Sequence, residues 1–231
     1  MSVFKFKEFV VRQDRSALKV GTDAMILGSL MTRNVEGKAL DIGAGTGVLS
    51  LMVAQMSLTI HVTGVEIDAN SHSDCKENFE SSRFNDRLKA VKGDYKEVQG
   101  EYDLIFCNPP FYLNGLISES DKINQAKHSD LAFVLELFSY VRYHLKSNGE
   151  FWCIYPFEHR HVILEIALNQ DLNLSVDYLV NSKEGVNSRS VMCFTKAKSN
   201  FQAGIITIRH SDGTYTEQYK SLTKEFHGKA L

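Results

Sequence analysis

Two adjacent prolines follow an asparagine in the segment Asn108-Pro109-Pro110-Phe111, directly after the apolar run 102–107. Proline fixes its own φ and has no N–H group, so the segment predicts a rigid loop that presents carbonyl oxygens. The Asn108 side-chain oxygen and the Pro109 carbonyl can accept both hydrogens of an amine, while Phe111 or Tyr112 can stack on an aromatic ring. The loop therefore favours chemistry on the exocyclic amine of a base. The competing interpretation is a tight turn that merely ends a strand.

A glycine-rich segment, Asp41-Ile42-Gly43-Ala44-Gly45-Thr46-Gly47, lies where a predicted strand leads into a predicted helix. Glycines let the backbone approach a ligand closely. A dinucleotide-binding turn needs G-x-G-x-x-G, whereas here the third glycine comes one residue early and Asp41 precedes the turn, which disfavours NAD. A sulfonium cofactor has a cationic amino end that a carboxylate suits. The pattern resembles the first motif of the class I methyltransferases, which implies S-adenosylmethionine as the cofactor.

Two further acidic residues are expected at the ends of the next two strands. Glu66 comes roughly 20 residues after the glycines, where a carboxylate binds ribose hydroxyls in folds of this type. Asp94 follows Gly93, where the same resemblance implies contact with the adenine amine of the cofactor. Either acid alone could be solvated or cap a helix. Their order, one for each strand after the glycine turn, favours the cofactor-binding interpretation.

Short apolar runs alternate with helical periodicity along most of the chain. Strands are expected at 38–43, 61–68, 88–94, 102–108 and 150–156, with a helix at 49–56 and a long helix that presents Leu131, Val134, Leu135, Phe138, Val141 and Leu145 and ends at Asn148-Gly149. This alternation predicts a mostly parallel sheet covered on both faces, with ligands at the carboxyl ends of the strands. Strands at 175–181, 190–197 and 204–210 predict an antiparallel edge, and residues 3–13 an added strand or hairpin.

The composition is that of an ordinary folded enzyme. The chain of 231 residues is long enough for one large domain, and its net charge of −2 gives no global attraction to nucleic acid, so RNA binding needs a local basic patch. No apolar stretch approaches the ~20 residues of a membrane span, and the N-terminus lacks the layout of a signal peptide, so we expect a cytoplasmic protein. The four cysteines are spaced singly, which predicts core residues and no metal site.

Three further segments carry a closer resemblance. Phe4-x-Phe6-x-x-Phe9, the segment Lys19-Val20-Gly21-Thr22-Asp23 and the tail from Tyr215 to Phe226 are similar to the bacterial tRNA1(Val) adenine N6-methyltransferases, which modify the purine just 3′ of the anticodon. The resemblance implies an α/β, Rossmann-like class I methyltransferase fold with a mostly parallel seven-stranded sheet, an antiparallel C-terminal edge and helices on both faces. It also implies one domain over 1–231, with 1–37 as an N-terminal extension and 38–231 as the catalytic core, and N6-methylation of an adenine in tRNA.

The same resemblance places Thr22 and Asp23 beside the methionine end of the cofactor and Lys19 near the mouth of the site. From the residues alone, Gly21-Thr22-Asp23 is a turn into a helix, with Thr22 or Asp23 as its cap. The expected catalytic residues are Asn108, Pro109, Pro110 and Phe111. The expected cofactor-binding residues are Thr22, Asp23, Asp41, Gly43, Gly45, Gly47, Glu66, Asp94 and Asn108, and the expected RNA-binding residues are Lys19, Tyr112, Lys127 and Arg189.

Other acceptors for the methyl group stay open at this point. They are a guanine amine of ribosomal RNA, the N6 amine of adenine in DNA, and the amide of a protein glutamine. The protein-glutamine enzymes with similar loops carry an N-terminal helical domain that the residues before Leu40 cannot supply, and a DNA enzyme usually has a larger recognition domain. A non-catalytic module that binds S-adenosylmethionine or RNA is a further alternative. We assume a monomer, without a metal ion and without a membrane partner.

Overall fold

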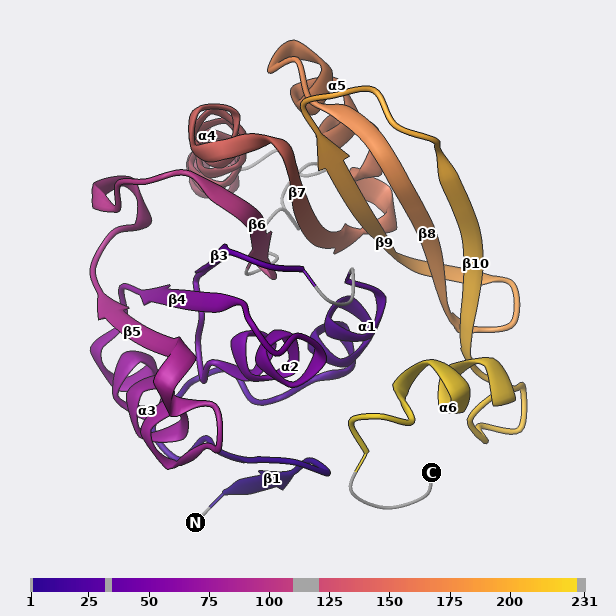
Figure 1. Cartoon of the computed structure of the whole chain (residues 1–231). Helices are drawn as coiled ribbons and strands as arrows, with labels where there is room; N and C mark the ends of the chain where they lie inside the picture. Colours follow the sequence, from indigo (N-terminus) through magenta and orange to yellow (C-terminus); the bar gives the residue numbers. More distant parts are fainter. Residues whose placement is uncertain (1, 32–34, 110–120, 228–231) are drawn as a thin grey trace.

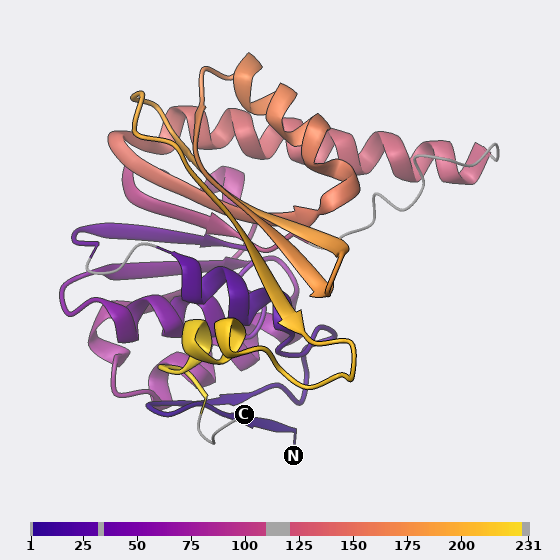
Figure 2. The same ribbon diagram turned by 90° about the vertical axis from the view of Figure 1, so that its right-hand side faces the viewer.

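The computed structural model describes residues 2–31, 35–109 and 121–227. Within these ranges, an eight-stranded sheet lies between two layers of helices (Figures 1 and 2). Three of the expected site residues, Pro110, Phe111 and Tyr112, lie outside the described residues. Lys127 lies in helix α4, whose side chains between 121 and 130 are not described. The rest of the candidate site can therefore be examined against the sequence predictions.

The main sheet has the strand order β10-β8-β9-β7-β6-β3-β4-β5. Its strands are β3 (Lys38–Ile42), β4 (His61–Glu66), β5 (Leu88–Lys92), β6 (Tyr102–Cys107), β7 (Leu145–Pro156), β8 (Asn173–Lys183), β9 (Val186–Thr195) and β10 (Gln202–Arg209). In the described sheet only β9 runs antiparallel to its neighbours, so the mostly parallel arrangement is confirmed. The carboxyl ends of β3, β4, β5 and β6 consequently share one edge.

The strand count and the C-terminal edge differ from the expectation. The sheet has eight strands rather than seven, and β10, at the edge, pairs in parallel with β8. The antiparallel strand is β9, which lies inside the sheet between β7 and β8. β9 and β10 run in opposite directions, as the short link between them predicts. They are not neighbours, because β8 lies between them in the sheet and pairs with both. Periodicity in a sequence does not report which strand becomes the neighbour.

Helices cover both faces of the sheet, as predicted (Figure 2). α1 (Thr22–Leu30), α2 (Val48–Met56), α3 (Ala69–Ser81) and α6 (Glu217–Thr223) lie on one face, and α4 (Asp121–His144) and α5 (Arg160–Asn169) lie on the other; the 3-10 turns are η1 (Asn85–Arg87), η2 (Tyr95–Glu97) and η4 (Phe157–His159). Each face has its own apolar cluster, because side chains alternate along the strands: Ala39 packs with α2, and Leu40 packs with α4. The four cysteines are buried free thiols. In the described ranges, no helix combines the length and apolar character needed to cross a membrane.

The long helix α4 ends earlier than the sequence predicts. The chain passes directly into β7 at Leu145, and Asn148 and Gly149 lie within β7, where its register with β6 shifts. They therefore form a strand irregularity instead of a helix terminus. Leu131 and Leu135, expected on the buried face of the helix, are 38% and 45% exposed. The buried stripe of α4 is narrower than the apolar pattern indicates.

The N-terminal residues form the expected hairpin, in which β1 (Val3–Lys5) pairs antiparallel with β2 (Val10–Arg12). The segment after the hairpin is held by α3. Asp74, which is 1% exposed, accepts hydrogen bonds from the backbone N–H groups of Arg15 and Ser16 and from the Ser16 hydroxyl. Its other oxygen lies 3.2 Å from the Arg15 guanidinium. A buried carboxylate thus fixes the part of the extension that directly follows the hairpin.

A second α3 side chain, Asn78, joins this segment to the glycine turn. Its Oδ1 accepts from the backbone N–H of Arg12 at 2.8 Å, and its Nδ2 donates to the carbonyls of Arg12 and Thr46 at 2.8 and 2.9 Å. Asn78 is fully buried, so none of these groups can exchange its partner for water. The position of the extension is therefore coupled to the turn that contains Thr46.

We expect Asn78→Ala to lower the free energy of unfolding by roughly 2–4 kcal/mol, because three hydrogen bonds are lost and their backbone partners stay buried. Asn70→Ala, an exposed position on the same helix, is the matched control and should change stability by less than about 0.5 kcal/mol. Urea unfolding followed by circular dichroism measures both values. Equal midpoints for the two variants would show that Asn78 does not anchor the turn.

Candidate functional site

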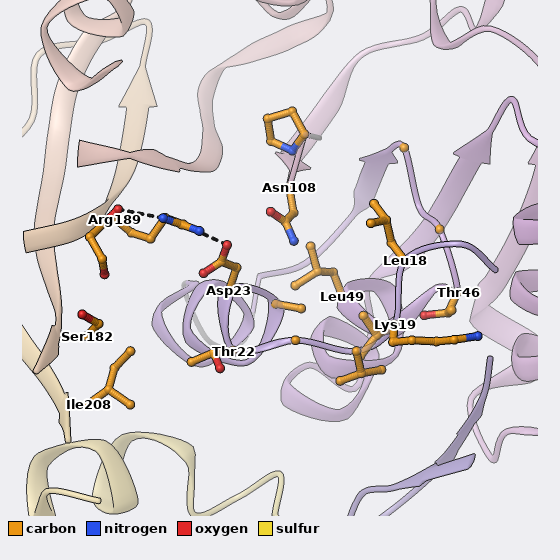
Figure 3. Close-up of a pocket in the computed structure, with 18 of the residues that line it drawn as sticks. Leu18, Lys19, Thr22, Asp23, Thr46, Leu49, Asn108, Ser182, Arg189 and Ile208 are labelled. Carbon is orange, nitrogen blue, oxygen red and sulfur yellow. Dashed lines mark hydrogen bonds and ion pairs between the residues drawn. The ribbon is translucent and has the colours of Figure 1, made fainter. Parts of the chain in front are cut away.

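The glycine turn and Asn108 lie side by side at the carboxyl ends of two paired strands. β3 and β6 pair in parallel, with Ile42 opposite Cys107. Gly43 and Asn108 are the next residues along these strands, and both line one cleft of about 860 Å³ (Figure 3). The two motifs that the sequence singles out for chemistry therefore meet in one cavity.

Three parts of the chain form the walls of this cleft. The lining residues are 18–24 from the extension and α1; Gly43, Ala44, Gly45, Thr46, Val48 and Leu49 from the turn and α2, with Asn108 and Pro109; and Ser182, Lys183, Val186, Ser188, Arg189, Ile208, Arg209 and Tyr215 from the C-terminal strands. Arg189, which the sequence predicts to bind RNA, lies on the third wall, but the sequence patterns did not indicate Arg209 or Tyr215. Arg209 reaches this wall through the parallel pairing of β10 with β8, and Tyr215 through its bridge to Arg209; the sequence carries no local signal for either.

The glycines of the turn have two different structural roles. Gly43 and Gly45 have positive φ values of 70° and 56°, and no atom lies within 4 Å of the position that a Cβ would take. Gly47 also has a positive φ, but a Cβ there would lie 2.4 Å from Cε1 of Phe79. Gly43 and Gly45 thus leave open space at the cleft, as expected for a cofactor cradle. Gly47 instead permits the close packing of α2 against α3.

Glu66 is the last residue of β4, as predicted, whereas Asp94 lies two residues after β5, which ends at Lys92; neither acid lines the cleft. Glu66 is 9% exposed, and its two carboxylate oxygens accept from the backbone N–H groups of Gly45 and Asp68, each at 2.8 Å. Asp94 accepts from the backbone N–H of Lys96 at 3.0 Å and so caps η2. Glu66 therefore holds the glycine turn in place. The expected ribose and adenine contacts of these two residues stay predictions.

Asp41 lies behind the turn rather than in the cleft. It is 1% exposed, and Oδ2 accepts from the Ser50 hydroxyl at 2.7 Å, which links β3 to α2. Burial, with a smaller contribution from the charge of Glu66, raises the pKa of Asp41 to about 7. A carboxyl that is partly protonated near neutral pH is a poor partner for a cofactor ammonium. Its position favours a role in shaping the turn.

Asn108 presents an acceptor without a donor. Its Oδ1 is buried and accepts no hydrogen bond from any residue in the described ranges, and its side chain points from the end of β6 into the cleft (Figure 3). A buried polar atom that lacks a partner costs about 1–3 kcal/mol, so this oxygen is suited to a donor brought by a ligand. The buried Pro109 lines the cleft beside it.

Asp23 supplies the carboxylate that does face the cleft. Helix α1 begins at Thr22 with Gly21 as its N-cap, and no side chain caps it, so the reading of Thr22 or Asp23 as the cap is wrong. Among the described residues that line the cleft, Asp23 alone carries a carboxylate. Nε of Arg189 donates to Oδ2 of Asp23 at 2.9 Å. Thr22 and Asp23 thus line the same cleft as the glycine turn, and their contact with the cofactor stays a prediction.

Lys19 lines the cleft, but its ammonium is bound by backbone carbonyls. Its ammonium donates to the backbone carbonyls of Gln13 and Ser16, within the N-terminal extension. Figure 3 shows the side chain extending away from Asn108. The ammonium thus holds together the loop that forms the first wall, and the expected RNA contact of Lys19 stays a prediction.

Alanine at two glycines of the turn should have different main effects. Gly45→Ala places a methyl group in the open space of the cleft, so we expect affinity for S-adenosylmethionine to fall at least about tenfold while stability changes by roughly 1–2 kcal/mol. Gly47→Ala forces Phe79 to move, so we expect a larger loss of stability. Calorimetric titration and urea unfolding measure the two effects. Wild-type affinity in Gly45→Ala would contradict the cradle.

Comparison with known proteins identifies the family. Residues 15–173 match the methyltransferase small domain. The chain is 34% identical over 233 residues to a tRNA1(Val) (adenine(37)-N6)-methyltransferase of Flavobacterium psychrophilum, covering 98% of this chain and 100% of that protein. It is 36% identical over 233 residues to the protein of the same name from Trichodesmium erythraeum, covering 98% of each.

The fold agrees with these matches. A predicted O-methyltransferase from Agrobacterium tumefaciens, known from a crystal structure, has a TM-score of 0.69 at 15% identity, over 91% of this chain and 98% of that one. This likeness confirms the class I methyltransferase fold that the sequence resemblance implies. With its fold, its cleft and its near full-length relatives in agreement, the chain belongs to the methyltransferase small domain family and to the family of the tRNA1(Val) (adenine(37)-N6)-methyltransferases.

Proposed function

We propose that this chain transfers the methyl group of S-adenosylmethionine to N6 of an adenine in tRNA, and that this adenine is the purine directly 3′ of the anticodon. One observation carries the proposal: the open glycine turn and the Asn108 Oδ1, which accepts no hydrogen bond from the residues that the structure describes, line the same cleft. The relatives that match almost the whole chain are named for this reaction, which supports adenine in tRNA over the other acceptors.

The described residues of the cleft fit the cofactor. Gly43 and Gly45 leave room for it, and Asp23 offers a carboxylate for its ammonium, with Thr22 beside it. When bound, S-adenosylmethionine supplies a methyl group already activated by a positively charged sulfur. Asp41, Gly47 and Glu66 would act indirectly, by holding the shape of the turn. Asp94, just after β5, would contact the adenine amine of the cofactor. Because the methyl group is already activated, the proposed reaction needs no metal ion.

Asn108 and Pro109 would hold the amine during transfer. The Asn108 Oδ1 and the Pro109 carbonyl accept its two hydrogens, which orients the nitrogen and frees its lone pair from the ring. A new bond forms from this nitrogen to the methyl carbon while the bond from carbon to sulfur breaks, and the sulfur leaves neutral. The nitrogen then loses one hydrogen to water as a proton. Alignment of the reacting atoms is the main contribution of these residues.

The third wall of the cleft suits RNA. Lys183, Arg189 and Arg209 are cations on this wall, and the Arg209 guanidinium lies 3.9 Å from the centre of the Tyr215 ring. Cations near the mouth can bind phosphates while an unpaired loop base enters at lower cost than a base in a duplex. We propose that one chain carries the whole site in the cytoplasm, with 38–231 as its catalytic core and 1–37 as an extension that walls the cleft.

Mass spectrometry of nucleosides tests this function. Purified protein incubated with unmodified tRNA and S-adenosylmethionine should produce N6-methyladenosine in a single tRNA species, at the position 3′ of the anticodon. N2-methylguanosine, or methyl transfer only to DNA or protein, would replace the proposed acceptor by one of the alternatives. No transfer to any of these acceptors would favour a binding module.

Asn108→Ala should reduce the rate of transfer by roughly 10²–10³-fold, the usual effect of removing one preorganised hydrogen-bonding group. Affinity for S-adenosylhomocysteine should stay within about threefold of the wild type, since the turn is intact. Asn70→Ala on the exposed face of α3 serves as the control and should keep both values. Wild-type turnover in Asn108→Ala would remove the proposed mechanism.

A further inference from the structure

An ion pair spans the cleft from its first wall to its third. Arg189, in β9, donates from Nε to Oδ2 of Asp23, in α1, at 2.9 Å, and its Nη1 donates to the carbonyl of Ser188 at 2.8 Å (Figure 3). The two side chains are 30% and 25% exposed. At such a partly buried position, charges attract more strongly than in bulk water. The ion pair therefore joins the first wall of the cleft to the third.

Asp23 would have to pair with two cations, Arg189 and the ammonium of the cofactor. It is the carboxylate that lines the described cleft, and it lies on α1 beside the open glycine turn, where the ammonium of the cofactor would need a partner. Its Oδ2 already accepts from Arg189. One carboxylate neutralises a single cation more fully than it neutralises two. An incoming ammonium must therefore weaken the attraction between Asp23 and Arg189.

The surroundings of Arg189 are suited to an anion. Lys183 on β8 and Arg209 on β10 are register partners at the same end of the sheet, and both line the cleft with Arg189. Glu184, in the adjacent hairpin, lies 3.1 Å from His210 and does not line the cleft. The described part of this wall thus contributes three cations and no carboxylate, and this charge attracts a phosphate of the RNA backbone.

We propose that the ammonium of the cofactor replaces Nε of Arg189 on Asp23, and that this Nε then binds a phosphate of the tRNA. Cofactor binding thereby strengthens RNA binding, and RNA strengthens cofactor binding by the same factor, because the coupling between two sites is reciprocal. This inference rests on the proposed function for its RNA partner. Its expected size is roughly three- to tenfold, as for a single partly exposed ion pair.

Two variants give opposite signs that a purely structural role would not produce. Arg189→Gln removes the competitor for Asp23, so the affinity for S-adenosylhomocysteine should rise roughly three- to tenfold, measured by calorimetry. Asp23→Asn should lower that affinity, yet it also weakens the acceptor of Arg189 Nε, so the affinity for tRNA without cofactor should rise. Filter binding of tRNA with and without S-adenosylhomocysteine should show coupling in the wild type and its loss in both variants.

Lys183→Gln is the matched control on the same wall. Lys183 is exposed and is not paired with Asp23, so this variant should bind tRNA more weakly while the cofactor affinity and the coupling persist. Weaker cofactor binding in Arg189→Gln would overturn the exchange, since it would mean that the guanidinium binds the carboxylate of the cofactor directly. Equal tRNA affinity with and without cofactor in the wild type would also overturn it.

The cofactor measurements need no RNA and therefore separate this inference from the proposed function. If tRNA is not methylated but Arg189→Gln still tightens cofactor binding, the proposed function fails while the competition for Asp23 stands. If tRNA is methylated but the cofactor affinity of Arg189→Gln falls, the exchange fails and the function stands. Circular dichroism of each variant confirms that the signs come from folded protein.

Discussion

The parallel pairing of β3 with β6 is the constraint on which the site depends. It sets Ile42 opposite Cys107 and so places Gly43 and Asn108 at one edge of the sheet. A slip of one residue would move Asn108 along its strand by about 3.3 Å, as much as the roughly 3–3.5 Å that separates reacting atoms in a productive complex. The strands are apolar and buried between two helix layers, and this burial fixes their register.

Buried polar side chains then hold the glycine turn in its observed shape. Asp41 ties β3 to α2 through Ser50, Glu66 accepts from the backbone of Gly45, and Asn78 binds the carbonyl of Thr46. The turn is consequently preorganised, with its positive φ values and open space already present. Asp41 and Glu66, which the sequence motifs assign to the cofactor, thus hold the shape of the turn. Asp23, on α1, is the carboxylate among the described lining residues that faces the cleft.

The sequence predicts the parts of the site that depend on local pattern. Gly43, Gly45 and Asn108 follow apolar runs of strand length, so their common edge could be deduced from the β-α-β order. The sequence could not reveal contacts between distant segments. Asp23 and Arg189 are 166 residues apart, and β10 pairs with β8 although β9 lies between them in the sequence. The family resemblance places Lys19 near the mouth, and Lys19 does line the cleft, but a sequence does not show that two backbone carbonyls bind its ammonium.

A crystal structure of the wild-type protein with S-adenosylhomocysteine tests the central claim most directly. The account predicts that the sulfur lies over Gly43 and Gly45 on the side of Asn108, so that a methyl group on it would come within about 3–3.5 Å of an amine held by Asn108 Oδ1. A ligand bound elsewhere, or a sulfur directed away from the end of β6, would contradict the shared use of these two strand ends.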